Sequence, residues 1–221
     1  MRTFRTRVKV CGITSAFDAG AAIAAGADAI GVILTDSPRQ LTIEQAERVF
    51  AAVPPFIARI GVFVDADEAE VAEAVVRLRL SAVQFHGAET AERCAAAPAP
   101  VIKALRVGES FSLLESCEPY RGAVAGLLLD TYVPGKAGGT GKTFAWERLG
   151  RIPDFVPVIV AGGLNPVNVG AAIRALRPFG VDVSSGVEEH PRAKDPYKLR
   201  AFVEAVRAAD EEVCDGLAAA N

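Results

Sequence analysis

Eight short apolar runs, spaced about 26 residues apart as in repeated strand–helix units, constrain the fold of this chain more than any other feature. The runs are rich in Val and Ile and are continuous rather than alternating, which is typical of parallel strands buried on both faces. We predict strands at 8–11, 29–34, 58–64, 82–85, 101–105, 124–129, 157–161 and 181–184. We predict helices at 17–25, 42–52, 67–79, 89–96, 111–118, 145–150, 166–176 and 196–209. The order favours an α/β fold, a single (β/α)8 TIM barrel spanning residues 1–221.

Composition narrows the class of protein. The 221 residues are 51% hydrophobic, enough for one core, and the net charge of −3 with no basic block argues against a nucleic-acid surface. The basic N-terminus lacks the apolar stretch of a secretory signal, and charges at Asp18 and Asp28 interrupt segment 16–34, so we expect no membrane span. Four scattered cysteines and two histidines match no zinc spacing and no disulfide framework. We expect a cytoplasmic protein without a bound metal.

Local signals predict several element ends. Thr42 and Gln45 form a capping box for the second helix, and Gly26 is suited to the turn after the first. Asn165 before Pro166 predicts a helix that begins at residue 166. The last helix is expected over 196–209, and it runs into Asp210 and an Ala-rich end that we expect to be frayed.

Polar residues follow almost every predicted strand, at the edge where barrel enzymes place their chemistry. They are Cys11, Arg39 after Ser37 and Pro38, Gln84, His86, Arg106 and Asp130, followed by Gly162, Gly163 and the segment 184–186. Packing hardly explains polar residues at so many strand ends, whereas a barrel in which all strands end at one shared active-site mouth does explain them.

Glycine-rich segments predict a phosphate site and a loop over it. Gly162 and Gly163 follow the seventh strand, and Ser185 and Gly186 follow the eighth, where barrels often bind phosphate through backbone N–H groups. The loop 135–143 fails the Walker A spacing by one residue and fits an active-site loop that closes over a ligand. A phosphorylated small molecule is the expected partner.

Cys11 and Asp130 follow the first and sixth strands, so a thiol and a carboxyl face one ligand from two sides. This pairing suits an isomerisation without a cofactor, in which one group donates a proton and the other removes one. A thiolate would need a nearby cation or helix N-terminus. Arg39 suits a bidentate grip on a substrate carboxylate, and His86 is as well suited to a supporting role as to a reactive one. The alternatives are a buried cysteine, a turn-capping aspartate and a solvated loop arginine.

The chain resembles the phosphoribosylanthranilate isomerases, the (β/α)8 enzymes of tryptophan biosynthesis. The matching segments run in order along almost the whole chain: KVCGIT (9–14), SPR (37–39), VQFHG (83–87), LLD (128–130), GGTG (138–141), AGGL (161–164) and VDVSSGVE (181–188). The first and last segments together are highly specific to this family.

The resemblance implies an Amadori rearrangement of N-(5-phosphoribosyl)anthranilate to 1-(2-carboxyphenylamino)-1-deoxyribulose 5-phosphate. Asp130 would be the general acid, Cys11 the general base, and Arg39 the ligand of the anthranilate carboxylate. The remaining substrate-binding positions carried over from the family are His86, Gly139, Gly141, Gly162, Gly163, Asp182, Ser185 and Gly186. The family implies no metal and no cofactor, and both monomers and homodimers are compatible with such barrels.

The sequence departs from the family pattern at three positions. Phe85 replaces a frequent Leu, Ala145 an acidic residue, and Arg192 a frequent Gly; none of these touches the expected chemistry. The sister isomerase of histidine biosynthesis is an alternative, but Cys11 stands where that family has an aspartate. A barrel synthase acting on indole glycerol phosphate and a catalytically silent barrel are further alternatives. An intact pair of Cys11 and Asp130 argues against the silent barrel.

Overall fold

Eight parallel strands close into a barrel in the computed structural model, which describes residues 5–108, 111–130, 146–150 and 152–219. Each strand pairs with its sequence neighbours, and β8 pairs with β1 to complete the ring. The predicted (β/α)8 fold is confirmed. The strands are β1 (Arg7–Cys11), β2 (Ala29–Ile33), β3 (Ala58–Phe63), β4 (Ala82–Phe85), β5 (Val101–Arg106), β6 (Gly126–Asp130), β7 (Val158–Ala161) and β8 (Gly180–Val183).

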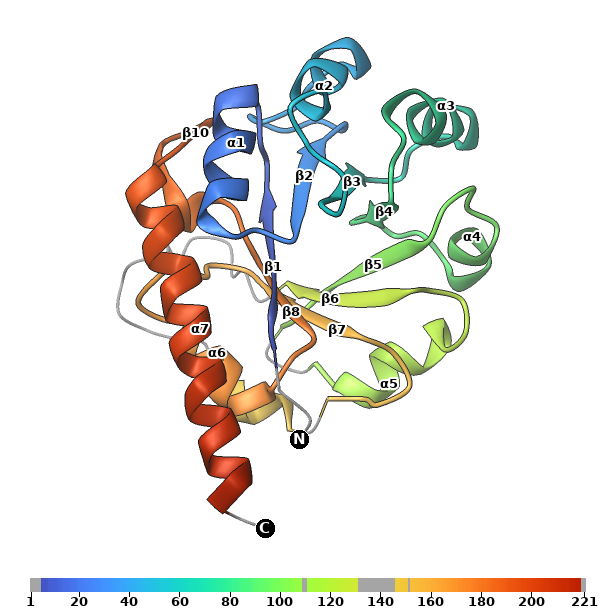
Figure 1. The fold of residues 1–221 in the computed structure, drawn as a ribbon. Coiled ribbons are helices and arrows are strands. Elements are labelled where there is room, and N and C mark those ends of the chain that lie inside the picture. The colour runs from blue at the N-terminus through green and yellow to red at the C-terminus, as the bar shows by residue number, and fades with distance from the viewer. Residues whose placement is uncertain (1–4, 109–110, 131–145, 151, 220–221) are drawn as a thin grey trace.

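Helices surround the strand ring, as Figure 1 shows. They are α1 (Ala16–Ala25), α2 (Ile43–Phe50), α3 (Glu68–Leu78), α4 (Ala91–Ala95), α5 (Leu113–Cys117), α6 (Val169–Leu176) and α7 (Pro196–Ala219). Short 3-10 helices lie at Glu118–Tyr120, Trp146–Leu149 and Ser185–Val187. The long α7 packs against α1 and α6, so the last helix closes the outer ring beside the first. None of the described helices is long and apolar enough to cross a membrane.

Strand register decides which side chains face the barrel interior. Residues paired across neighbouring parallel strands point to the same side, and alternate residues point to opposite sides. The inner core around Ala104, Leu128 and Ala161 is small, and the larger core lies between the strands and the helices. The pairs Arg106 with Asp130 and Ala104 with Leu128 therefore place Asp130 on the inward face, one level above the inner core.

Most predicted elements are confirmed to within two residues at each end, and three regions differ. The sixth helix begins at Val169 rather than at 166, because the Asn165 side chain accepts hydrogen bonds from the N–H groups of Val167 and Asn168 and holds a turn there. The predicted end of the last helix near residue 209 is wrong. α7 continues to Ala219, and the buried carboxylate of Asp210 accepts two hydrogen bonds from Thr6.

The third difference is a small antiparallel pair, β9 (Glu188–His190) and β10 (Ala193–Lys194), between β8 and α7. Its turn contains Arg192 with a φ of 77°, the left-handed region that glycine adopts at little cost. The departure from the frequent glycine is therefore a strained arginine. The capping predictions for Thr42 with Gln45 and for Gly26, whose φ is 111°, are confirmed.

Candidate active site

The inward face at the carboxyl ends of the strands brings together most of the predicted site. Register places Cys11 of β1, Gln84 of β4, Asp130 of β6 and Asp182 of β8 on that face. His86 follows β4, two residues beyond Gln84, and its side chain contacts Gln84 and Asp130. Residues separated by up to 171 positions in the chain therefore line one mouth, because every parallel strand ends at the same edge.

Cys11 lies beside a buried ion pair. Lys9 Nζ donates to Asp182 Oδ1 at 2.9 Å, and the two side chains are 5% and 9% exposed. A methyl group placed on Gly31 of β2 would lie 3.2 Å from both Lys9 Nζ and Cys11 Sγ, so the ammonium and the thiol share one small space. Burial raises the pKa of the Cys11 thiol, although the Lys9 ammonium opposes that rise. The Cys11 thiol is therefore buried and lies close to the Lys9 ammonium.

Asp130 is paired with His86 on the other side of the mouth. His86 Nε2 lies 3.1 Å from Asp130 Oδ2, and His86 Nδ1 lies 3.0 Å from the side-chain nitrogen of Gln84. An amide nitrogen can only donate, so in this orientation Nδ1 accepts and Nε2 carries the hydrogen toward Asp130. The buried Gln84 Oε1 has no hydrogen-bond partner in the described part of the chain. The imidazole is thus held between a carboxylate and an adjustable amide.

Arg39 makes a bidentate grip, and its partner is a carboxylate of the protein itself. Its Nε and Nη2 donate to the two oxygens of Glu188 at 2.7 and 2.6 Å. Lys194 Nζ donates to the same carboxylate at 2.9 Å and to the carbonyl of Ser184. Burial works to raise the pKa of Glu188, but hydrogen bonds from Arg39 and Lys194 outweigh it and lower that pKa. The bidentate edge of Arg39 is therefore occupied by Glu188, and the bidentate grip on a substrate carboxylate that the sequence predicts for Arg39 is not open in this arrangement.

The turns after β7 and β8 touch each other, as a shared phosphate site requires. Gly162 and Gly163 have φ values of 86° and 64°, a conformation that favours glycine. A side chain at Gly186 would collide with the carbonyl oxygen of Leu164, so that position needs a residue without a Cβ. Ser185 is exposed at the start of the 3-10 helix that follows β8. Gly139 and Gly141, predicted to contact the ligand, lie outside the described residues.

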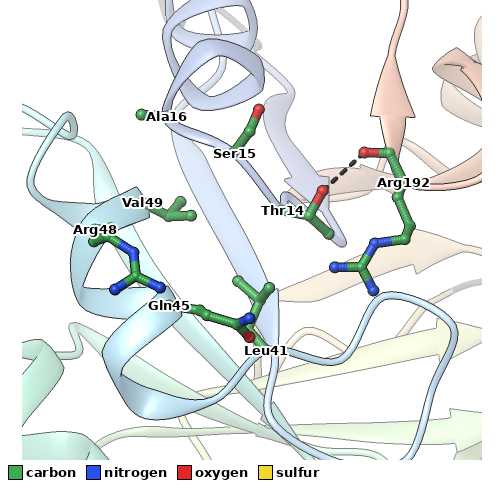
Figure 2. A pocket seen from close by; sticks show the side chains of 8 residues that line it. All are labelled: Thr14, Ser15, Ala16, Leu41, Gln45, Arg48, Val49 and Arg192. Carbon is green, nitrogen blue, oxygen red and sulfur yellow. Dashed lines mark hydrogen bonds between the residues drawn. The ribbon is translucent and has the colours of Figure 1, made fainter.

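A separate hollow of about 280 Å³ lies between the start of α1, α2 and the β9–β10 turn, and Figure 2 shows the side chains that line it. Side chains from the start of α1, from α2 and from the β9–β10 turn line it: Thr14, Ser15, Ala16, Leu41, Gln45, Arg48, Val49 and Arg192. None of the predicted catalytic or binding residues belongs to this set. Thr14 donates to the carbonyl of Arg192 across it, which ties the strained turn to the loop after β1.

Sequence reasoning missed the charged partners of these residues. Lys9 and Lys194 are buried, and Glu188 accepts from Arg39 as well as from Lys194. One signal for Lys9 was available, because a lysine between Val8 and Val10 is unusual in a strand that is otherwise apolar. No comparable signal marks Glu188 or Lys194, whose burial depends on the small β9–β10 pair. No group of three or more His, Cys, Asp or Glu residues suited to a metal occurs among the described residues.

A closed (β/α)8 barrel whose strand ends gather a thiol, two carboxyls and an imidazole belongs to the TIM-barrel enzymes. The chain matches the family model for N-(5′-phosphoribosyl)anthranilate (PRA) isomerase over residues 8–205. It is 48% identical over 204 residues to the N-(5′-phosphoribosyl)anthranilate isomerase of Pseudomonas fluorescens strain SBW25, covering 91% of this chain and 95% of that protein.

Solved structures agree with this match. The phosphoribosyl anthranilate isomerase of Thermotoga maritima superimposes with a TM-score of 0.82 at 38% identity, covering 92% of this chain and 99% of that one. A second isomerase structure, in complex with reduced 1-(o-carboxyphenylamino)-1-deoxyribulose 5-phosphate, gives a TM-score of 0.78 at 35% identity, with coverage of 92% and 99%. The chain belongs to the N-(5′-phosphoribosyl)anthranilate isomerase family, and it is an isomerase of tryptophan biosynthesis.

Proposed function

We propose that the chain converts N-(5-phosphoribosyl)anthranilate to 1-(2-carboxyphenylamino)-1-deoxyribulose 5-phosphate, with Asp130 as general acid and Cys11 as general base. The observation that carries this assignment is the placement of both residues on the inward face at the carboxyl ends of β1 and β6. The reaction moves hydrogens within one molecule, so a positioned acid and a positioned base supply what it requires. No cofactor and no metal enter the proposal.

The proposed sequence begins with Asp130. Its proton passes to the ribose ring oxygen, the C1–O bond breaks, and the nitrogen lone pair forms a Schiff base at C1. Cys11, as a thiolate, then removes the proton from C2, and the electrons move to the nitrogen to form an enolamine. Tautomerisation of this enolamine to the ketone completes the rearrangement. Asp130 acts on the ring oxygen and Cys11 acts on C2, on the other side of C1, which fits their positions on separate sides of the mouth.

Gln84 supports the acid form of Asp130. When Asp130 holds the proton, His86 Nε2 must accept it as a hydrogen bond, so His86 Nδ1 carries the imidazole hydrogen. A rotation of the Gln84 amide then presents Oε1 to Nδ1. That oxygen is buried without a partner in the described residues, so the rotation gives it a donor, while the amide nitrogen gives up its bond to His86 and the number of hydrogen bonds stays the same. The same three side chains can therefore hold both protonation states of Asp130.

The proposed binding residues form two groups, one for each charged end of the ligand. We propose that Gly162, Gly163, Ser185 and Gly186 hold the phosphate, supported by the contact between the two turns. Arg39 would hold the anthranilate carboxylate through the N–H groups that Glu188 leaves over, which are the two of Nη1 and the second of Nη2, since Nε and one N–H of Nη2 bind Glu188. Asp182, His86, Gly139 and Gly141 complete the proposed binding set.

Two further parts of the proposal concern the whole molecule. We propose a single barrel domain over residues 1–221 that works in the cytoplasm, where a reduced Cys11 is maintained; Cys11, Cys94 and Cys117 are free thiols. Its assembly is proposed to be a monomer or a homodimer. A related structure, 34% identical with a TM-score of 0.76, is of monomers generated from the dimeric isomerase of Thermotoga maritima. Light scattering on the purified protein separates 23.1 kDa from twice that mass.

The test follows the loss of anthranilate-derived fluorescence. N-(5-phosphoribosyl)anthranilate is generated in situ, and purified protein is added in the presence of a chelator. We expect Cys11→Ser and Asp130→Asn to fold normally and to lose about 10²–10⁴-fold in turnover, the usual contribution of a positioned acid or base. Cys214→Ser, which removes a thiol on α7 far from the mouth, is the matched control and should keep wild-type turnover. Near wild-type rates in either active-site variant would remove that residue from its role.

A further inference from the structure

Lys9 and Lys194 are charged residues near Cys11 that the chemistry proposed above does not use, and Lys9 shares the space beside Gly31 with the sulfur. Lys9 lies two residues before Cys11 on β1, and both side chains face the barrel interior next to Gly31 of β2. Gly31 is what makes this possible, because a methyl group there would lie 3.1 Å from Lys9 Cε and 3.2 Å from Cys11 Sγ. Such contacts are tighter than ordinary packing and would push the two side chains apart.

The Lys9 ammonium lies next to two acidic groups, the Asp182 carboxyl and the Cys11 thiol. It donates to Asp182 at 2.9 Å from one side and faces the thiol from the other. Burial works to lower the pKa of Lys9, but the Asp182 carboxylate and the negative charge of a Cys11 thiolate outweigh it and raise that pKa. The lysine therefore stays protonated in the mouth, and a single positive charge is available to two groups that can each become negative.

We infer that Lys9 is a positioning residue that governs the charge of Cys11, because its ammonium is shared between the Asp182 carboxylate and the Cys11 sulfur. The inference rests on the proposed function only in calling Cys11 the base. When Asp182 holds the ammonium, the thiol keeps its proton. When a ligand hydroxyl donates to Asp182 and weakens that ion pair, the ammonium can turn to the sulfur and stabilise the thiolate.

The charged groups around Cys11 carry an excess of one positive charge, which a thiolate would balance. Arg39 of the β2–α2 loop and Lys194 of β10 both bind the single carboxylate of Glu188, and both act electrostatically on Cys11. Across the mouth, His86 and Asp130 act on Asp182 rather than on the sulfur. In the described surroundings of the thiol, three cations therefore face two carboxylates, so a thiolate brings this group to neutrality.

The proposal makes opposite predictions for the two partners of the ammonium. Lys9→Met removes the positive charge, and the pH at which Cys11 ionises should rise by about 1–3 pH units, the usual effect of an adjacent opposite charge. Asp182→Asn leaves the ammonium to the sulfur alone, and that pH should fall. The double variant Lys9→Met/Asp182→Asn carries no unpaired buried charge, which guards against a folding failure. Its Cys11 should ionise at a higher pH than in Asp182→Asn alone.

The measurement is the rate of alkylation of Cys11 by iodoacetamide as a function of pH in the unliganded full-length protein. Mass spectrometry of the peptides separates the four cysteines, and Cys214 on α7 is the internal reference whose profile should not change. Opposite shifts of the Cys11 profile in the two single variants support the proposal. An unchanged profile in Lys9→Met, or shifts in the same direction, overturns it.

Turnover by Cys11→Ser decides the proposed function independently of this result. If that variant keeps near wild-type turnover while the alkylation profiles shift oppositely, Lys9 still governs the charge of the thiol, but the thiol is not the base. If Cys11→Ser loses turnover and the Lys9→Met profile is unchanged, the base assignment holds and the role of Lys9 fails. Each proposal can thus fail alone.

Discussion

Two buried lysines in this barrel form carboxylate pairs of almost the same length in different surroundings. Lys9 and Asp182 lie 2.9 Å apart inside the barrel mouth, and Lys103 and Glu89 lie 3.0 Å apart on the outer side of the strand ring. Lys103 Nζ also donates to the carbonyls of Gly87 at 2.7 Å and Phe85 at 3.4 Å. All three donor directions of Lys103 are therefore used by the protein itself.

The Glu89 carboxylate is equally well satisfied. It accepts from the N–H groups of Asp65 and Gly87, both at 2.9 Å, as well as from Lys103. These bonds fix the segment between β4 and α4, which begins with His86. The pair of Lys103 and Glu89 is complete and holds backbone in place. The pair of Lys9 and Asp182 has one additional acid, Cys11, within its reach. A buried lysine whose three N–H groups all bind protein acceptors therefore stabilises the structure, whereas one whose N–H groups are shared with a titratable thiol can support chemistry.

The largest expected effect is on stability when the complete pair is broken. Lys103→Met leaves the Glu89 carboxylate buried without its cation, and we expect it to lower the free energy of unfolding by about 3–5 kcal/mol. Lys9→Met should cost less, because Asp182 lies at the mouth and can take up a proton. Urea unfolding of both variants measures the difference. A greater loss in Lys9→Met than in Lys103→Met would contradict the comparison.

The dependence of stability on pH should have opposite signs at the two carboxylates. Burial works to raise the pKa of Glu89, but the hydrogen bonds from Asp65 and Lys103 lower it below its ordinary value of 4.5. Glu89 therefore stabilises the fold above the ordinary carboxyl pKa, and this contribution is lost as the pH falls through its lowered pKa. For Asp182, burial outweighs the attraction of Lys9 and raises the pKa above 3.8. The folded state then binds the proton more tightly, and its contribution declines as the pH rises from the ordinary value through the raised one.

Unfolding free energies of wild type, Glu89→Gln and Asp182→Asn between pH 3 and pH 7 measure these signs. The difference between wild type and Glu89→Gln should grow with rising pH. The difference between wild type and Asp182→Asn should shrink over the same change. Two slopes of the same sign would show that the two carboxylates are in equivalent surroundings, contrary to the different roles that we assign to the two ion pairs.

The smallest expected effect concerns the turn that carries Lys194 toward the mouth. Arg192 has a φ of 77°, and Arg192→Gly should stabilise the protein by about 1 kcal/mol by relieving the left-handed backbone, less the loss of the hydrogen bond from Arg192 to the carbonyl of Pro38. Thermal unfolding measures the gain. Because the change leaves both lysine pairs intact, turnover should be unchanged, and a large loss of turnover would mean that this turn contributes to the mouth.

The sequence predicted the strands well because each is a short apolar run with polar boundaries, and local pattern is sufficient to locate such runs. Cys11 and Asp130 were found for the same reason, since a polar residue at the end of an apolar run marks the catalytic edge of a barrel. The start of α6 and the length of α7 were not predicted correctly. The first depends on the side chain of Asn165 within a turn, and the second on the contact of Asp210 with Thr6, 204 positions away in the chain.

The (β/α)8 fold, the catalytic edge and the family could be predicted from the sequence, because apolar periodicity and ordered motifs are local properties of the chain. The partner of each charged side chain depends on the three-dimensional fold. Lys9 meets Asp182, Arg39 meets Glu188 and His86 meets Asp130 because barrel closure joins β8 to β1 and brings loops from distant segments to one rim. These pairings depend on register and burial, and neither property is recorded in the spacing of residues along the chain.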